Sequence, residues 1–217
     1  MARTSRARAI WTPAERRIFR AEPLLDGAAA LAEAQRCLQC FAPPCQAHCP
    51  AGLPVGRFIR MIRSGNLRGA AETVRAANPM IASCGDACPS DRYCAAACTR
   101  AELDAPIRIR ELHRYATRMG ERAAPRPLRH APRSGQRVAV VGGGPAGLTC
   151  ALELRRLGVD VVLHEARSTL GGVLAHAIPL DRFPDETIAA DGRWVVERAI
   201  DAPATLEVRL NHPIEEP

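Results

Sequence analysis

The sequence has no lysine, few aromatic residues and no long apolar run. All 30 basic residues are arginine, and aromatic residues make up 4% of the 217 positions. No segment approaches the ~20 consecutive apolar residues of a membrane-spanning helix, so we expect a soluble, cytoplasmic chain. A net charge of +7 would suit nucleic-acid binding, but the scarcity of aromatic residues and the scattered arginines argue against it.

A secretory signal is also missing, which bears on how the cysteines are used. The first ten residues, Met1–Ile10, are rich in arginine, and no uninterrupted apolar segment follows them. Disulfide frameworks form in oxidising compartments. We therefore expect thiols rather than disulfides.

Eight of the nine cysteines fall into two short runs, Cys37-x2-Cys40-x4-Cys45-x3-Cys49-Pro50 and Cys84-x3-Cys88-Pro89-x4-Cys94-x3-Cys98. Four closely spaced thiolates are what a [4Fe–4S] cluster requires, and a proline after the last cysteine is typical of bacterial ferredoxins. Two runs predict two clusters. Structural zinc is the alternative, although zinc sites usually pair two short knuckles across a longer gap. The ninth cysteine, Cys150, is interpreted as core packing.

Helical patterns surround both cysteine runs. Asp26 and Ser90-Asp91 are candidate N-caps, and apolar residues recur at helical spacing between the runs. The predicted helices span residues 12–20, 28–38, 54–63, 66–77, 90–97 and 106–122. The clusters are therefore expected to lie in a helical frame.

The character of the sequence changes after residue 124. Residues 125–136 are rich in proline and have no periodicity, which is typical of a linker. An apolar strand at 138–141, a helix at 145–157 and a strand at 159–163 then predict a parallel βαβ unit. A helix at 185–200 and a strand near 206–210 follow. We therefore predict an α-helical bis-iron–sulfur domain (1–124), a linker (125–136) and a partial α/β Rossmann-like FAD-binding domain (137–217).

A dinucleotide-binding motif joins the first strand to the next helix. The segment Gly142-Gly143-Gly144-Pro145-Ala146-Gly147 fits G-x-G-x-x-G in its proper context. Gly142 makes the tight turn, Gly144 lets the backbone approach a pyrophosphate, and Gly147 lets the helix pack on the strand. Glu165, at the end of the second strand, would bind ribose hydroxyls and favours FAD or NAD over NADP. A glycine-rich turn in an unrelated α/β domain is the alternative.

A glycine pair follows this motif. Gly171-Gly172 is separated from Glu165 by five residues. This E-x5-G-G pattern resembles the FAD-binding signature of flavoproteins with two dinucleotide domains. It favours FAD over NAD.

The order of these features resembles one family. Two cysteine runs, the helix from Pro106, the linker and the glycine turn resemble the N-terminal part of the glutamate synthase small (β) subunit. They also resemble the matching region of dihydropyrimidine dehydrogenase. The resemblance covers essentially the whole chain, and it is supported by the phrases Cys37-Leu-Gln-Cys40, Pro44-Cys45-Gln46, Asn78-Pro79 and Ile178-Pro179.

The resemblance implies two [4Fe–4S] clusters whose ligands interleave between the runs. One cluster would take Cys37, Cys40, Cys45 and Cys98, and the other would take Cys49, Cys88 and Cys94. In the family the fourth ligand of the second cluster can be a non-cysteine residue, and aligning Pro106-Ile107 puts His113 there. Simple counting would use Cys84 instead. The family also implies that Arg182 contacts the flavin nucleotide.

The implied function is electron transfer. In the family, NAD(P)H reduces FAD, and the clusters pass electrons to a partner such as the large subunit of glutamate synthase or a pyrimidine-reducing domain. Family members are longer and carry an NADPH-binding domain with its own glycine motif, and this sequence has no second one. We expect a fragment or truncated product, with completion by a partner chain as the alternative. A zinc-stabilised interaction module and a non-catalytic scaffold are the rival functions.

Overall fold

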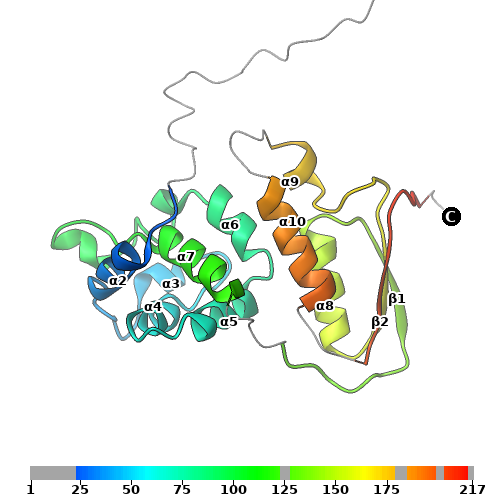
Figure 1. Ribbon diagram of the computed structural model, residues 1–217, viewed down its shortest axis with the longest axis horizontal. Helices are drawn as coiled ribbons and strands as arrows, with labels where there is room; N and C mark the ends of the chain where they lie inside the picture. Colours follow the sequence, from blue (N-terminus) through cyan, green and yellow to red (C-terminus); the bar gives the residue numbers. More distant parts are fainter. Residues whose placement is uncertain (1–22, 123–127, 179–184, 199–202, 215–217) are drawn as a thin grey trace, which may run out of the picture.

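The computed structural model describes residues 23–122, 128–178, 185–198 and 203–214. Helices come first along the chain, and a small parallel sheet follows them (Figure 1). This order confirms the predicted fold class of a helical region followed by a Rossmann-like region. The helix predicted at residues 12–20 lies outside the described residues.

Polar caps begin two helices of the first region. The Asp26 carboxylate accepts a hydrogen bond from the Ala29 N–H at 2.8 Å, and the Asn66 side chain accepts one from the Gly69 N–H at 2.9 Å. Each satisfies a first-turn donor that has no partner within its helix. The elements are α2 (Gly27–Gln35), α3 (Pro44–Ala47), α4 (Val55–Arg63), α5 (Leu67–Ala77), α6 (Ile81–Ala87), α7 (Ile109–Arg122) and the 3₁₀ turns η1 (Ser90–Arg92) and η2 (Thr99–Glu102).

The core of the helical region forms between α2, α4, α5 and α7. Helix α4 buries one face, which carries Val55, Phe58, Ile59 and Ile62, as its spacing predicts. Cys94 and Cys98 lie inside this core, and Cys37, Cys45, Cys49 and Cys84 pack against it. The cysteines therefore border a dry, packed interior.

Helices α5 and α7 approach each other closely at a glycine. A methyl group on Gly120 would lie 2.1 Å from the Ala71 Cβ atom and 2.9 Å from the Leu67 carbonyl oxygen. Both distances are well below van der Waals contact. Any side chain at position 120 would push the two helices apart.

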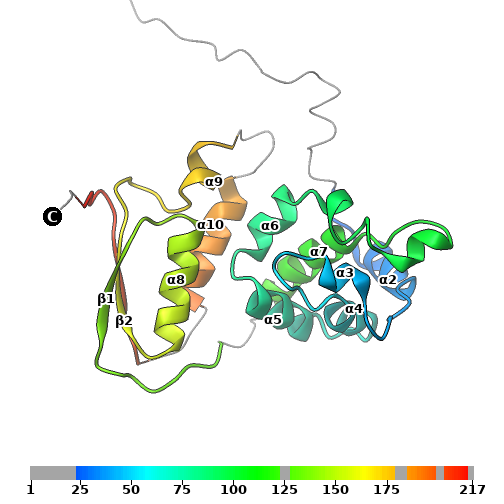
Figure 2. The same ribbon diagram turned by 180° about the vertical axis from the view of Figure 1, so that it is seen from behind.

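The second region is a parallel sheet covered by helices. Its described strands β1 (Arg137–Val141), β2 (Asp160–His164) and β3 (Leu206–Arg209) pair in the order β1-β2-β3. The helices are α8 (Pro145–Arg156), α9 (Val173–His176), α10 (Asp185–Arg193) and the π-helix η3 (Trp194–Arg198). In both views α8 and α10 lie between the sheet and the helical region (Figures 1 and 2). None of the described helices is long and apolar enough to cross a membrane.

Several predicted helix boundaries were wrong. The helix expected at 90–97 is only the turn η1, because Tyr93 leaves helical conformation at φ −127° and ψ −109°. The helix expected from Pro106 begins at Ile109, and the one expected to reach Leu38 ends at Gln35. Helix α6 was not predicted at all. The helix expected at 185–200 is α10 followed by a π-helix.

Gly120→Ala is expected to destabilise the protein by about 1–3 kcal/mol, because the added methyl overpacks the α5–α7 contact. Urea unfolding followed by circular dichroism measures this change. Gly192→Ala is the matched control, since it also places alanine in a helix but meets no atom within 4 Å. Equal losses in the two variants would contradict the proposed overpacking.

Candidate functional site

One pocket gathers cysteines from both runs. Its lining includes Cys37, Cys40 and Cys45 from the first run and Cys98 from the end of the second. The buried apolar residues Val55, Ile59, Ile107 and Ile109 also line it, together with the polar residues Gln39, Thr99 and Arg100. The structure therefore brings together the four residues that the family resemblance implies for one cluster.

Hydrogen bonds reach two sulfurs of this pocket. The Gln39 amide nitrogen donates to the Cys37 sulfur, and the Ile107 N–H donates to the Cys98 sulfur, each at 3.4 Å. Gln39 holds a left-handed backbone at φ 55°. Burial, followed by the neighbouring Cys98 and Cys37 thiols, raises the pKa of Cys45 to about 11. Donors aimed at sulfur stabilise the thiolate form and tune the potential of a bound cluster.

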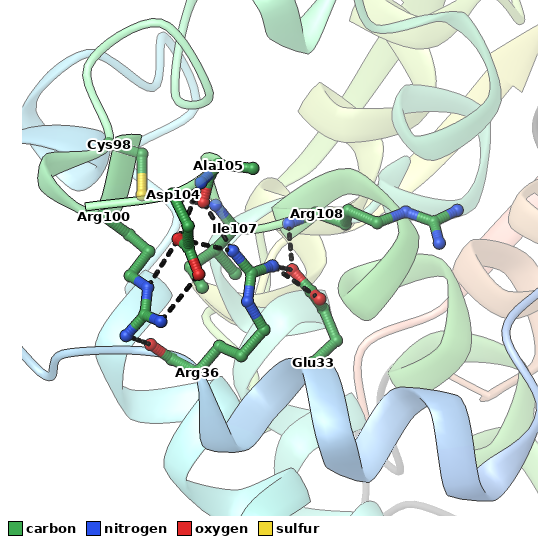
Figure 3. A network of polar contacts seen from close by, with 8 residues as sticks. All are labelled: Glu33, Arg36, Cys98, Arg100, Asp104, Ala105, Ile107 and Arg108. Carbon is green, nitrogen blue, oxygen red and sulfur yellow. Dashed lines mark hydrogen bonds and ion pairs between the residues drawn. The ribbon is translucent and has the colours of Figure 1, made fainter. Parts of the chain in front are cut away.

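A polar network fixes the backbone on both sides of this pocket (Figure 3). Arg36, immediately before Cys37, donates to both Glu33 carboxylate oxygens at 2.8 Å. It also donates to Asp104 at 2.9 Å and to the Ala105 carbonyl at 2.7 Å. The end of α2 is thereby joined to the segment that follows Cys98.

Asp104 is the centre of this network. Its carboxylate accepts from Arg100 at 2.8 and 2.7 Å, from Arg36 and from the Ala105 N–H. The Arg100 hydrogen bond and then the Ala105 N–H hold the pKa of Asp104 well below its usual range. The Arg108 N–H also donates to Glu33, at 2.9 Å. We call Glu33, Arg36, Arg100 and Asp104 the arginine–carboxylate clamp.

The remaining cysteines form a second group beside the first. The Cys84 thiol, together with the Arg110 charge, lowers the pKa of Cys88 to about 7, although burial opposes this shift. Burial, and then the charges of Cys88, Cys49 and Cys45, raise the pKa of Cys94 to about 12. In the described part of the chain, no three His, Cys, Asp or Glu side chains converge closely enough to hold a single metal ion.

His113 lies on α7 with its ring buried. The residue is 4% exposed, and neither ring nitrogen has a hydrogen-bond partner among the described residues. Its Nε2 atom faces α6, where it would lie 3.3 Å from a Cβ atom on Gly85. Burial lowers the pKa of His113 to about 3, with further contributions from Arg114 and Arg110. The ring is therefore neutral, and the lone pair of one nitrogen is available to coordinate a metal.

The glycine turn of the second region has the form that its motif predicts. Gly142 adopts φ 97°, which a side chain would disfavour. A methyl group on Gly147 would lie 1.8 Å from the Gly142 carbonyl oxygen, so only glycine lets α8 pack this closely on the turn. No side chain caps α8 at Gly144. Pro145 and Ala146 form the first helical positions, and Ala146 is exposed.

Glu165 and the glycine pair flank this turn. The Glu165 carboxylate, just beyond β2, accepts from the Gly143 N–H at 2.7 Å and from the Arg167 N–H at 2.8 Å. The Gly171 N–H donates to the Gly143 carbonyl at 2.8 Å. Gly172, at φ 52°, lies so close to Gly144 that a methyl group would come within 2.7 Å of the Gly144 Cα atom.

Comparison with known proteins gives two domain matches. Residues 16–124 match the family model described as dihydropyrimidine dehydrogenase domain II, 4Fe-4S cluster. Residues 140–191 match an NAD(P)-binding Rossmann-like domain. The chain belongs to the dihydropyrimidine dehydrogenase domain II family. Membership confirms the predicted resemblance and favours iron–sulfur chemistry over structural zinc.

Curated relatives of this family member are oxidoreductase subunits. It is 37% identical over 179 residues to the NAD-dependent dihydropyrimidine dehydrogenase subunit PreT of Salmonella typhimurium, covering 82% of this chain and 43% of that protein. It is 33% identical over 168 residues to the glutamate synthase [NADPH] small chain of Escherichia coli, covering 77% of this chain and 35% of that protein. The chain thus spans less than half the length of these relatives.

Three other expectations from the sequence concern Cys150, the state of the thiols and Arg182. Cys150 is exposed on α8, so its interpretation as core packing was wrong; the helix turns this position away from the sheet. All nine cysteines are free thiols in the structure. Arg182 lies outside the described residues.

Sequence reasoning missed the arginine–carboxylate clamp. Arg36 and Asp104 are 68 residues apart along the chain, and arginine–carboxylate pairs are common on protein surfaces. No local pattern therefore marks them. Only their positions beside Cys37 and Cys98 could have suggested a role.

Asp104→Ala is expected to loosen the segment after Cys98, because Arg36 and Arg100 lose their shared acceptor. Amide exchange of Ile107, whose N–H reaches the Cys98 sulfur, should become about tenfold faster. Since the pKa of Asp104 is lowered, its contribution is present above pH ~4 and is lost as the pH falls through the folded-state pKa. Glu102→Ala, on the same turn, is the control, and equal exchange in both variants would contradict a clamping role.

Proposed function

We propose that this chain is the electron-relaying part of an NAD(P)H-dependent iron–sulfur flavoprotein oxidoreductase. It would hold two [4Fe–4S] clusters and the nucleotide half of an FAD, and it would pass electrons to a partner active site. The observation that carries the proposal is the pocket that joins Cys98 to the first cysteine run. Four thiols from two distant segments meet there, as a cubane with four cysteine ligands requires.

The first cluster would be held by Cys37, Cys40, Cys45 and Cys98. Buried apolar residues line part of their pocket and would limit the access of water to a bound cluster. The hydrogen bonds from Gln39 and Ile107 would then stabilise negative charge on two of the sulfurs. The arginine–carboxylate clamp would hold the end of α2, before Cys37, beside the segment that follows Cys98.

The second cluster would be held by Cys49, Cys88, Cys94 and His113. The burial of the His113 ring supports its role as a ligand. Its nitrogens have no hydrogen-bond partner among the described residues, and burying a polar group in this way costs free energy. Coordination to iron would use one of its two unpartnered nitrogens. Cys84 is the alternative ligand. An imidazole ligand would raise the potential of the cluster.

The glycine turn would hold FAD through its ADP half. The uncapped start of α8 leaves backbone N–H groups for the pyrophosphate, and Glu165 lies beside the turn, where it can accept from ribose hydroxyls. Gly171 and Gly172 let the following segment pack directly on the turn. When bound, the flavin accepts a hydride and the clusters carry single electrons.

The partner would be a redox subunit or domain that carries the substrate site, as in a glutamate synthase large subunit or a pyrimidine-reducing domain. The relatives PreT and the glutamate synthase small chain are named as a subunit and a small chain. Beside the first pocket, Leu38, Phe41 and Leu103 are 44, 106 and 67% exposed. Exposed apolar side chains would suit a protein-binding surface if they form one patch in the assembled enzyme. Neither nucleic acid nor a membrane is proposed as a partner.

Anaerobic reconstitution with iron and sulfide is expected to give two [4Fe–4S] clusters, measured by iron content and by the electron paramagnetic resonance of the reduced protein. Cys98→Ala should remove the signal of one cluster, because it deletes a ligand contributed by the second run. His113→Ala should alter or remove the other signal. Cys84→Ala should leave both signals unchanged.

Two results would contradict this assignment. Loss of the second signal in Cys84→Ala, with both signals retained in His113→Ala, would establish an all-cysteine second cluster. A colourless protein that contains zinc as purified would overturn the iron–sulfur function itself.

FAD is expected to bind more tightly than NAD or NADP, as measured by quenching of flavin fluorescence and by competition. Glu165→Gln should weaken FAD binding about tenfold, because it removes a charged acceptor for the ribose hydroxyls. The cluster signals should stay unchanged and serve as the folding control. Tighter binding of NAD than of FAD would contradict the flavin assignment.

A further inference from the structure

A carboxylate of the nucleotide-binding region caps a helix of the iron–sulfur region. Asp191, on α10, accepts from the Ser83 N–H at 2.7 Å and from the Ala82 N–H at 3.4 Å. These are first-turn donors of α6, whose own preceding residue, Met80, provides no side-chain cap. Asp191 thus does for α6 what an N-cap residue does within a single domain.

The same carboxylate neutralises a buried arginine. Asp191 pairs with Arg75 of α5, and the two side chains are 0 and 1% exposed. Arg75 also donates to the Pro79 carbonyl at 2.7 Å and stacks over the Trp194 ring. A pair this deeply buried is costly to break, because each partner would lose a charge contact in a site that water does not reach. The start of α6 is therefore tied firmly to α10.

The other end of α6 is tied to α10 through a second carboxylate. Asp86 of α6 accepts from the Thr187 hydroxyl of α10 at 2.6 Å and from the Arg114 guanidinium of α7 at 2.8 Å. Asp86 lies between Cys84 and Cys88, and Arg114 directly follows His113. One buried carboxylate thus connects α10 of the nucleotide-binding region to α6 and α7, next in sequence to the candidate ligands on those helices.

Helix α10 also contacts the nucleotide site. Ile188 lies between Thr187 and Asp191, and a methyl group on Gly171 would come within 2.5 Å of its side chain. Gly171 in turn hydrogen-bonds to the glycine turn at Gly143. Figures 1 and 2 both show α10 between α6 and the sheet. A single helix therefore lies against both the second cysteine group and the nucleotide-binding turn.

We infer that Thr187 and Asp191 are positioning residues for the second cluster site. By bonding to both ends of α6, they set where Cys84 and Cys88 stand relative to the glycine turn. The geometry of the second cluster then depends on docking of the nucleotide-binding region. The first cluster, whose pocket α10 does not line, is independent of it. The assignment of the cluster ligands rests on the proposed function. The contacts between α6 and α10 do not depend on it.

The test uses the full chain and the substitution Thr187→Val, which keeps the shape and removes the hydroxyl. Amide exchange across residues 81–87 should become about tenfold faster, because α6 loses one of its two attachments. After reconstitution, the electron paramagnetic resonance signal and the midpoint potential of the second cluster should change. Those of the first cluster should not. Thr187→Ser restores the hydroxyl and should restore both readouts.

The matched control is Thr205→Val. Thr205 also donates its hydroxyl to an aspartate, Asp160, at 3.2 Å, but both residues lie within the nucleotide-binding region. This variant should leave α6 exchange and both cluster signals unchanged. Asp191→Ala should have a larger effect than Thr187→Val, although the loss of its charge also destabilises the fold through Arg75.

The outcomes separate this inference from the proposed function. Unchanged α6 exchange in Thr187→Val, or an equal change in both clusters, would overturn the positioning role. Failure of the unsubstituted chain to assemble clusters would overturn the proposed function. In that case the amide exchange of residues 81–87 in Thr187→Val would still show whether α10 positions α6.

Discussion

The interaction on which the cysteine pocket depends is the arginine–carboxylate clamp, which holds the segment after Cys98 beside the end of α2. The proposed cluster would require this placement, because a cubane bound by four cysteines would take ligands from both runs. The chain meets this requirement by returning after η2 to the end of α2, where Arg36 and Asp104 bind each other at 2.9 Å. Ile107 then donates its N–H to the Cys98 sulfur. The helical core provides the rigid wall against which both segments rest.

Buried charge links the two regions of the molecule. Isolated surface ion pairs contribute little to stability, whereas a buried pair is strongly destabilising when one partner is removed. Arg75 with Asp191 and Arg114 with Asp86 are buried pairs of this kind. The first pair joins α5 to α10 across the two regions, and the second joins α7 to α6 within the helical region, so a shift of these helices would break buried charge contacts. Electron transfer between a flavin and a cluster would benefit from such a fixed separation.

Much of the fold could be predicted from the sequence because its signals are local. The Asp26 cap and the apolar face of α4 depend only on neighbours within a few residues, and both are present in the structure. The glycine turn is equally local, since Gly142 and Gly147 are required by backbone contacts within one strand–helix unit. Helix α6 escaped prediction because its cap, Asp191, is more than a hundred residues away. The helix predicted at 90–97 is replaced by a turn that places Cys94 and Cys98 in the core.

By itself the sequence determined the ligand types, their grouping into two runs and the nucleotide-binding turn, because residue identity and short spacing carry that information. It could imply but not establish which cysteines share a site. Only the tertiary structure placed Cys98 with the first run, gave neither nitrogen of His113 a partner among the described residues, and joined α10 to α6. These features arise from contacts between residues far apart in the chain, where burial and charge pairing, rather than local conformational preference, select the arrangement.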